Sequence, residues 1–434
     1  MVATATRMVA ASLLAVTAAA AAREHDAAGK LGFQPIWGVA LALTAIVVTQ
    51  LALHFRTTTT AASKANGEKQ EEQVQSVLQK DEALERQAEV SPQAYPVGTL
   101  VNTKAHGAVK VLAFDAETEM YKVETNSEDG VKTVNLHEQE IEATEVADFY
   151  MYPIKSCAGI RLNSVDITAK GILHDRSWMF ADEDGKFITQ RRYHKMALIT
   201  PKLLPNIENP KSILLTAPGM EDLEVPILRE GHGKEADVRV WGSNMVAIDQ
   251  GDRVSEWINT FLADVRRDRK LRFFRVKDSF KRATDPKYAP DHETGFADGF
   301  PFLLALESSL DELNKSLDHP VLMNRFRPNI VLKGSPPFAD EYWNCLVIDG
   351  ILFRNVKPCS RCNLPCVDQA TGISDPNREP SKTLTRLRNG ELLGFTDGKK
   401  YECYFGSNLV AERVGTLKVG ARVKVLTMKD EIIA

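Results

Sequence analysis

The chain has 434 residues, of which 44% are hydrophobic and 26% are charged, so length and composition predict a globular protein of two or three domains. Its formal net charge of −4 argues against a general nucleic-acid partner, which would favour a basic face. Six cysteines in so long a chain are not typical of a secreted disulfide framework and indicate a reducing compartment for the main body.

Residues 1–55 are predicted to hold a targeting segment followed by a transmembrane anchor. Residues 8–22 are apolar and rich in alanine, like a targeting segment or a weak signal-peptide core. Ile36–Leu53 is an 18-residue stretch without a charged side chain, which is just long enough to cross a hydrocarbon core as a helix. Trp37 and Arg56 lie at its two ends as interfacial anchors do, and the slight excess of basic residues after it favours a cytosolic main body.

Two segments of different character follow the predicted anchor. Residues 56–94 are dense in Thr, Glu, Gln and Lys, and we expect a polar linker that is either disordered or a short exposed helix. Residues 95–143 contain four or five short strand-like runs separated by turn-forming residues such as Gly107. This spacing resembles that of small SH3-like or Tudor-like β-barrels, and a spacer that holds the main body off the membrane is the simplest role.

Four segments of the main body place Lys or Arg beside small hydroxyl or amide side chains at the edges of apolar strands. They are Tyr152–Gly159, His174–Met179, Phe187–Arg191 and Asn324–Val331. Arginine forks and a lysine point charge are what a phosphorylated, hydrogen-bond-rich ligand requires. The sequence has no Gly-x-x-x-x-Gly-Lys-Ser/Thr loop and no dinucleotide fingerprint, so side chains from distant segments would have to hold the phosphate.

The stretch Lys357–Asp368 contains three of the six cysteines and is predicted to be a loop that leaves a strand. Lys357 and Arg361 bracket Cys359, and neighbouring positive charge favours the thiolate, which is the form that binds metals. Spacing alone leaves open a structural zinc site, an iron–sulfur cluster, a thioredoxin-like redox pair, or a single thiolate for a soft metal carried by a cofactor. A zinc site would draw its ligands from Cys359, Cys362, Cys366 and Cys403. We favour the single thiolate at Cys359 and expect the other three cysteines to be buried apolar residues.

Other segments predict architecture rather than chemistry. Residues 255–262 and 307–317 have apolar side chains at helical spacing and are expected to be packed helices, and residues 415–425 are expected to form a closing strand pair. Side chains expected in the core or in structural roles are Trp178, Trp241, Trp343, His174 and His194. Strands outnumber helices, so the predicted fold class is α+β and mainly β, with barrels covered by a few helices.

Taken in order, the motifs of the main body resemble those of the MOSC family of molybdenum-cofactor proteins. The order is Tyr-Pro-Ile-Lys-Ser, Asp-Arg-x-Trp, Thr-x-Arg, Phe-Arg-Pro-Asn-Ile, Cys-x-Arg-Cys with Val-Asp, and Phe-Gly-x-Asn. The resemblance covers about residues 146–426 and implies a MOSC N-terminal β-barrel domain over residues 146–272 and a MOSC domain over residues 290–428. The anchored layout is similar to that of the mitochondrial amidoxime-reducing components, which reduce N-hydroxylated compounds.

The resemblance also implies roles for individual residues. Cys359 matches the cysteine that supplies a thiolate to molybdenum, so it is the predicted catalytic and metal-binding residue. Positions that hold the pterin and its phosphate are matched by Lys155, Ser156, Arg176, Arg327 and Asn329. Further cofactor-binding positions are matched by Arg191, Ser360, Arg361 and Asn408. The segment Asp298–Phe302 lacks the Thr-Ser pair of the corresponding family loop, and Cys366 stands where a threonine is commoner.

The implied cofactor is molybdenum–molybdopterin, and the implied substrates are small N-hydroxylated compounds. The sequence shows no haem, flavin or nicotinamide signature, so electrons are expected from cytochrome b5 and its reductase. A negatively charged donor is expected to dock on a positive rim of Lys155, Arg191 and Arg192. The expected location is the outer mitochondrial membrane with the body in the cytosol, or else the endoplasmic reticulum. Two alternatives remain: a module that carries cofactor or sulfur to other enzymes, and a zinc-stabilised interaction protein.

Overall fold

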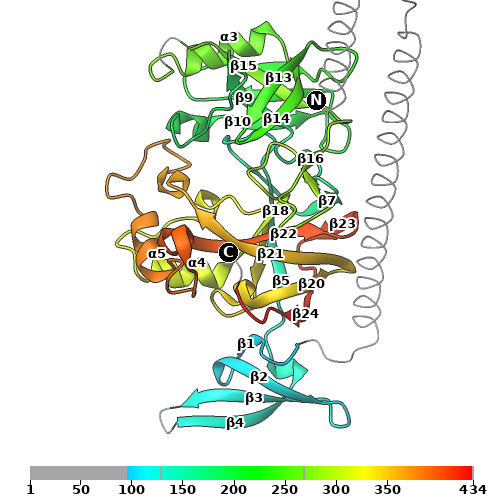
Figure 1. The fold of residues 1–434 in the computed structure, drawn as a ribbon, viewed down its shortest axis with the longest axis vertical. Coiled ribbons are helices and arrows are strands. Elements are labelled where there is room, and N and C mark those ends of the chain that lie inside the picture. Colours follow the sequence, from blue (N-terminus) through cyan, green and yellow to red (C-terminus); the bar gives the residue numbers. More distant parts are fainter. Residues whose placement is uncertain (1–94, 128–129, 267–268, 433–434) are drawn as a thin grey trace, which may run out of the picture. The chain divides into compact units, whose positions relative to one another are not determined.

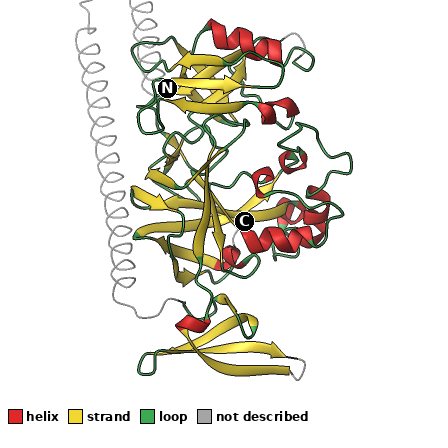
Figure 2. Ribbon diagram, turned by 180° about the vertical axis from the view of Figure 1, so that it is seen from behind, coloured by secondary structure: helices red, strands yellow, loops and turns green. Residues whose placement is uncertain are grey.

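The computed structural model describes residues 95–432, except residues 128–129 and 267–268 (Figure 1). The predicted targeting segment, transmembrane anchor and polar linker lie outside the described residues. Within the described ranges, no helix is both long enough and apolar enough to span a membrane. This part of the chain is mainly β (Figure 2). It contains three α-helices and several single 3-10 turns.

Residues 95–143 form a four-stranded antiparallel sheet in the order β1-β2-β3-β4. Its strands are β1 (Leu100–Thr103), β2 (Gly107–Asp115), β3 (Met120–Ser127) and β4 (Gly130–His137). Alternate residues point to one face of a pleated strand, and here that face carries a small core around Val111 and Tyr121. A single bridge between Thr103 and Ile141 joins β1 to the segment that follows β4.

The main body is organised around an eight-stranded sheet in the order β24-β20-β21-β22-β18-β19-β5-β6 (Figure 1). Its strands are β5 (Glu145–Met151), β6 (Ile160–Leu162), β18 (Phe302–Leu306), β19 (Ile330–Lys333), β20 (Trp343–Ile348), β21 (Ile351–Arg361), β22 (Cys403–Ala411) and β24 (Val423–Met428). Neighbours pair antiparallel except β18 and β19, which are parallel. Most predicted cofactor-binding residues lie on these strands or directly beside them.

A second group of strands is built from residues 178–276. One sheet has the order β13-β14-β15-β9 and another has the order β10-β11-β12. The strands are β9 (Trp178–Asp182), β10 (Thr200–Leu204), β11 (Ser212–Thr216), β12 (Leu223–Pro226), β13 (Glu235–Val240), β14 (Ser243–Asp249) and β15 (Leu271–Val276). Helix α3 (Asp252–Phe261) buries Val254, Trp257, Ile258 and Phe261, a spacing that places all four on one helical face. The helix predicted over residues 255–262 is therefore confirmed, with a start three residues earlier.

The remaining elements are short. Helix α4 (Glu307–Asn314) confirms the helix predicted over residues 307–317, and helix α5 is Ser381–Leu387. The small strands are β7 (Ser164–Thr168), β8 (Gly171–Ile172), β16 (Arg282–Ala283), β17 (Glu293–Thr294) and β23 (Gly415–Lys418). The strand pair predicted within residues 415–425 is wrong, because β23 pairs with β7 while β24 pairs with β20 in a different sheet.

Two of the three tryptophans predicted to lie in the core are buried, and the third is exposed. Trp178 and Trp343 are almost fully buried, as expected. Trp241 keeps 44% of its surface exposed, so its assignment to the core is wrong. It occupies the two-residue turn between β13 and β14, where a side chain lies outside the sheet core.

Candidate cofactor site

Cys359 lies near the end of strand β21 and not in a loop, which corrects the prediction for this stretch. Two residues of β22, Phe405 and Gly406, stand opposite Cys359 alone, so the ladder contains a β-bulge at this point. Gly406 has a φ of +74°, and a Cβ atom there would lie 2.5 Å from the carbonyl oxygen of Leu304. Only glycine fits this position without strain. The bulge leaves the thiol of Cys359 half-buried at the edge of the ladder.

Arg361 holds the thiol of Cys359 from the same strand. Its Nη1 lies 3.1 Å from the Cys359 sulfur, and its Nη2 donates to the carbonyl oxygen of Phe326 at 2.7 Å. The other predicted neighbour, Lys357, instead lies over the ring of Tyr288, with 4.5 Å between its Nζ and the ring centroid. Arg361 is therefore the cation that contacts the thiol.

The large sheet connects this thiol to the basic motifs that lie earlier in the chain. Lys357 on β21 is opposite Asn408 on β22, which in turn is opposite Leu303 on β18. The backbone amide of Asn329 donates to the carbonyl oxygen of Leu303 at 2.7 Å. The backbone amide of Leu303 in turn donates to Oδ1 of Asn329 at 3.2 Å. Neighbouring strands are about 4.8 Å apart, so the row from β21 to Asn329 spans roughly 14 Å. Arg361 gives a shorter connection, because it contacts both the Cys359 sulfur and the carbonyl oxygen of Phe326.

Asn329 is the centre of a buried hydrogen-bond network. Its Nδ2 donates to the carbonyl oxygen of Tyr150 at 3.1 Å and to the carboxylate of Asp175 at 3.0 Å, and its Oδ1 accepts from Arg176 at 3.0 Å. Asp175 also accepts from Arg176 at 2.5 Å. Burial raises the pKa of Asp175, although Arg176 and the other donors act in the opposite direction. Both ends of the Asn329 amide are therefore engaged within the protein.

Tyr152 lies between two of the predicted arginines. The guanidinium carbons of Arg176 and Arg327 lie 4.4 Å and 4.1 Å from the centroid of its ring. Nη1 of Arg327 donates to the carbonyl oxygen of Cys157 at 2.6 Å, whereas its Nη2 has no hydrogen-bond partner among the described residues. Burial lowers the pKa of Arg327 to about 10 and raises that of Tyr152 to about 12. Arg327 therefore retains a donor for an anionic ligand.

Three of the predicted cofactor-binding residues have left-handed backbone conformations. The φ angles are +66° at Ser156, +44° at Arg176 and +58° at Arg327. Such conformations cost non-glycine residues of the order of 1–3 kcal/mol each, and they cluster at ligand sites. Arg176 and Arg327 lie over the ring of Tyr152, and Ser156 follows Tyr152 by four residues in the chain.

Lys155 is deeply buried, with 5% of its surface exposed. Its Nζ donates to the carbonyl oxygen of Phe296 at 2.8 Å and forms a short ion pair with Asp298. Burial lowers the pKa of Lys155, while the carboxylate of Asp298 opposes this effect. The expectation that Lys155 forms part of an exposed docking rim is therefore wrong. Asp298 is the first residue of the segment Asp298–Phe302, which lacks the Thr-Ser pair of the family. This segment therefore offers a carboxylate to Lys155.

Comparisons with known proteins show which family the chain belongs to. The profile of the MOSC N-terminal beta barrel domain matches residues 143–265, and that of the MOSC domain matches residues 291–424. Mitochondrial amidoxime reducing component 2 of Rattus norvegicus is 34% identical over 286 residues, which cover 63% of this chain and 81% of the relative. The chain belongs to the MOSC family. Mitochondrial amidoxime-reducing component 1 of Homo sapiens is 30% identical over 291 residues, or 65% of this chain and 82% of the relative.

The other cysteines of the MOSC domain have different environments. Cys366 and Cys403 are buried, as expected, and the sulfur of Cys366 donates to the hydroxyl oxygen of Ser381 at 3.2 Å. Cys362 is exposed, so its assignment to the core is wrong. Within the described ranges, no three His, Cys, Asp or Glu side chains are placed to share a metal ion. Cys362 is instead a thiol beside the site, one residue after Arg361.

One ion pair beside the MOSC site was not anticipated from the sequence. The carboxylate of Asp368 accepts from Arg325 at 2.8 Å, and its other oxygen accepts from the backbone amides of Ala370 and Thr371. The Val-Asp motif thus holds the segment after the cysteines against the turn before Arg327. Aspartate side chains often accept a hydrogen bond from the backbone amide two residues later and so mark turns, and this tendency could have suggested the role of Asp368.

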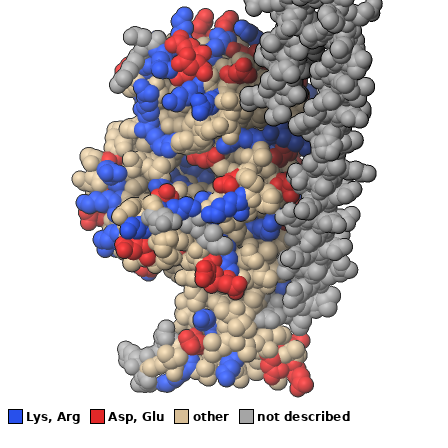
Figure 3. All heavy atoms as spheres, viewed as in Figure 1, with Lys and Arg blue, Asp and Glu red and all other residues tan. Residues whose placement is uncertain are grey.

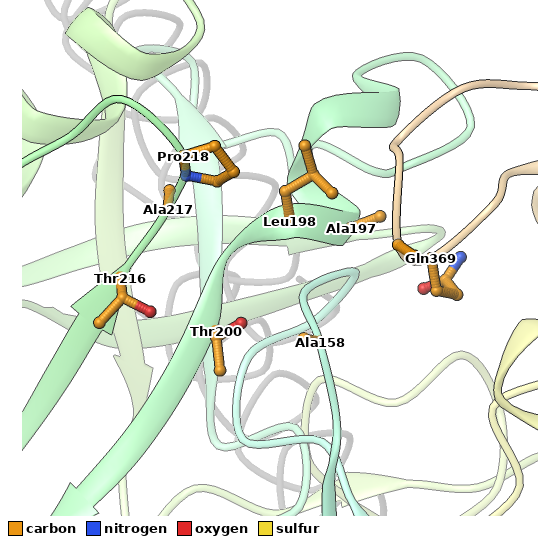
Figure 4. A pocket seen from close by; sticks show the side chains of 9 residues that line it. Ala158, Ala197, Leu198, Thr200, Thr216, Ala217, Pro218 and Gln369 are labelled. Atoms are coloured by element: carbon orange, nitrogen blue, oxygen red, sulfur yellow. The ribbon is translucent and has the colours of Figure 1, made fainter.

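Two pockets of the MOSC protein lie away from Cys359. A pocket of about 460 Å³ is lined by small and apolar side chains with Gln369 at its edge, and it contains no titratable group (Figure 4). A pocket of about 610 Å³ contains Arg191, together with three other cations and Trp241. Arg191 stacks on Trp241 with 4.5 Å between its guanidinium carbon and the ring centroid. Arg191 therefore lies outside the network around Tyr152, whereas Ser360 and Asn408 lie on β21 and β22 beside Cys359.

Proposed function

We propose that this chain is a molybdenum-cofactor oxidoreductase that reduces N-hydroxylated compounds, with Cys359 as the protein ligand of the metal. The observation that carries the proposal is a half-buried thiol on a β-bulge, 3.1 Å from a guanidinium and joined through the sheet to a buried basic network. The names of the relatives support the reaction class, because they describe reduction of amidoximes.

The residues fit such a cofactor in two respects. Nη2 of Arg327 and Nε of Arg361 are buried donors without a hydrogen-bond partner in the described part of the chain. A buried donor left unpaired costs about 1–3 kcal/mol, so an anionic acceptor such as a pterin phosphate would relieve that cost. A cysteine thiolate is also a soft sulfur ligand, which suits a molybdenum centre better than a carboxylate would.

The roles of the residues follow from their contacts. Cys359 would bind the metal through its sulfur, and Arg361, whose Nη1 lies 3.1 Å from that sulfur, would orient it. The remaining cofactor-binding residues that we propose are Lys155, Ser156, Arg176, Arg191, Arg327, Asn329, Ser360 and Asn408. Because the side chains of Arg176 and Asn329 are already hydrogen-bonded internally, they mainly orient Arg327 and the backbone beside it. When bound, the cofactor supplies a metal able to take an oxygen atom from an N–O bond.

The proposal extends to partners and location. We propose cytochrome b5 and its reductase as electron donors, with Arg191 and Arg192 on the docking face and without Lys155, since that side chain is buried. We also propose that the N-terminal segment anchors the chain in the outer mitochondrial membrane, with the body in the cytosol. The uncharged stretch Ile36–Leu53 and the mitochondrial names of the relatives support this location.

The test compares two cysteines of the same segment. We expect roughly one molybdenum per chain, and we expect Cys359→Ser to lose both molybdenum and N-hydroxylated-substrate turnover because serine is not a soft ligand. The matched control Cys362→Ser removes an exposed thiol three residues away and should retain both properties. Full turnover in Cys359→Ser would refute the proposal. Bound molybdenum without turnover in the unmutated protein, supplied with reduced cytochrome b5, would instead favour a cofactor carrier.

A further inference from the structure

The pocket of about 610 Å³ shares Arg191 and Arg192 with the proposed function, but most of its lining has no role there. It is lined by four cations, Lys186, Arg191, Arg192 and Arg239, and by the rings of Phe187 and Trp241. Among the described residues none of these four cations forms an ion pair, and Asp182, the acidic residue of the lining, is paired with Arg269 at 2.6 Å. Figure 3 shows Lys and Arg side chains interspersed with Asp and Glu on the face of the described residues that is in view.

The backbone explains how these residues meet. The segment after β9 folds back onto β13, where the amide of Phe187 donates to the carbonyl oxygen of Arg239 at 3.3 Å and the amide of Arg239 donates to Gly185 at 2.8 Å. Lys186 and Arg239 are therefore neighbours in a short parallel bridge. The following turn places Arg191 and Arg192 on the same side, so two chain segments supply cations to one pocket.

Trp241 has an unfavourable position that a purely structural role does not explain. It is the first residue of the two-residue turn between β13 and β14 and has a φ of +52°. Such turns favour Asn, Asp or Gly there, and a bulky residue with positive φ is a genuine outlier. The side chain is also 44% exposed, so it gains little from burial. Backbone strain of this kind points to a residue retained for contact with a ligand.

The contacts of Trp241 orient its ring at the pocket. Its Nε1 donates to the carboxylate of Asp298 at 3.0 Å, its ring meets Phe187 edge-on at 5.1 Å between centroids, and Arg191 lies over it. The ring is thus fixed from three sides while much of its surface remains open. Arg239 Nε donates to the carbonyl oxygen of Trp241 at 3.1 Å, and no acidic side chain of the described residues pairs with the guanidinium groups. A fixed aromatic face beside such groups suits a flat ring that carries a negative charge.

We propose that this pocket binds small organic anions that carry a planar ring, with the ring on Trp241 and the anionic group between Arg192 and Arg239. Guanidinium forks match carboxylate and phosphate oxygens, and the aromatic face adds contact area that an inorganic anion cannot use. This assignment shares Arg191 and Arg192 with the proposed function, but it needs neither Cys359 nor the network around Tyr152, because neither lines the pocket.

The test measures binding by calorimetry with the full-length protein and three probes: phenyl phosphate, phenol and inorganic phosphate. We expect phenyl phosphate to bind at least about tenfold more tightly than either other probe, because each lacks one of the two contacts. The double variant Arg192→Ser/Arg239→Ser should weaken phenyl phosphate binding by about tenfold or more, while the matched control Arg253→Ser, an exposed arginine of α3, should change it less than about twofold.

A second variant separates the ring from the charge. Trp241→Leu should reduce phenyl phosphate binding to the level of inorganic phosphate and leave inorganic phosphate binding unchanged. Unchanged phenyl phosphate affinity in the double variant would overturn the proposal, because the probe would then bind elsewhere. The proposal would also fail if no probe bound and the double variant only weakened docking of an acidic protein. Thermal unfolding of each variant verifies that loss of binding is not loss of fold.

Discussion

The substitution Gly406→Ala should destabilise the protein more than alanine does at another glycine of similar backbone conformation. Gly406 is part of the bulge opposite Cys359 and has a φ of +74°. An added Cβ would lie 2.5 Å from the carbonyl oxygen of Leu304, which belongs to the neighbouring strand β18 and cannot move without breaking the sheet. Gly350, in the turn between β20 and β21, has a φ of +80°, but a Cβ added there would have no other atom within 4 Å.

The two substitutions share one cost and differ in another. A left-handed conformation costs an alanine about 1–2 kcal/mol relative to glycine, and both variants incur that cost. Overpacking inside a well-packed structure costs a further 1–3 kcal/mol or so, and only Gly406→Ala incurs it. We therefore expect the free energy of unfolding to fall by about 2–5 kcal/mol in Gly406→Ala and by about 1–2 kcal/mol in Gly350→Ala.

Equilibrium urea denaturation followed by tryptophan fluorescence measures this difference. Because the bulge positions the thiol, Gly406→Ala should also lower the molybdenum content of the folded protein, whereas Gly350→Ala should not. If the two variants unfolded at the same urea concentration with the same slope, the close approach of β22 to Leu304 would not constrain the bulge, and the reasoning would be refuted.

Three other substitutions have defined expectations. Burial lowers the pKa of His174 to about 4, so between pH 6.5 and 4 the unfolded chain binds a proton that the folded chain does not. This difference lowers the free energy of unfolding by up to about 3 kcal/mol as the pH falls through that range. His174→Asn should therefore lose less stability over the same range. Asn329→Ala should lower the free energy of unfolding by about 2–4 kcal/mol, because it leaves buried partners unpaired, whereas Asn344→Ala on the surface should cost less than about 0.5 kcal/mol. Asp368→Asn should weaken the contact with Arg325 and speed hydrogen exchange of the amides that follow it.

Each expectation can fail on its own measurement. If the free energy of unfolding fell equally with pH in the wild type and in His174→Asn, the imidazole would titrate alike in the folded and unfolded states. Equal unfolding free energies for the two asparagine variants would show that the Asn329 network contributes no more than a surface contact. Unchanged exchange rates in residues 370–373 would show that Asp368 does not order its segment.

Much of the fold could be predicted because apolar side chains recur at regular spacing along its helices and strands. Helix α3 was expected from apolar residues at helical spacing, and the strands of residues 95–143 were expected from alternation between turns. The errors arose where a local pattern depends on a distant partner. The strands within residues 415–425 look like a pair in sequence, but β23 and β24 join different sheets, because each finds its partner about 80 or more residues away.

The candidate site shows the same limit at the level of side chains. Ordered motifs predicted which segments meet, yet they could not show that Lys155 is buried on Asp298 or that Trp241 is exposed in a turn. A lysine after a strand is usually solvated, and a tryptophan is usually core, so both exceptions depend on tertiary contacts. Cys362 was misassigned for the same reason, since cysteine is among the most buried residue types.

The left-handed residues near Tyr152 depend on contacts within the protein. Ser156, Arg176 and Arg327 each adopt a conformation that an isolated peptide would avoid. Contacts within the protein must offset the free-energy cost of these conformations. The described structure shows such contacts in the hydrogen bonds of Asn329 and in the packing of two guanidinium groups on Tyr152. These contacts within the protein therefore offset part of the cost of the three left-handed conformations.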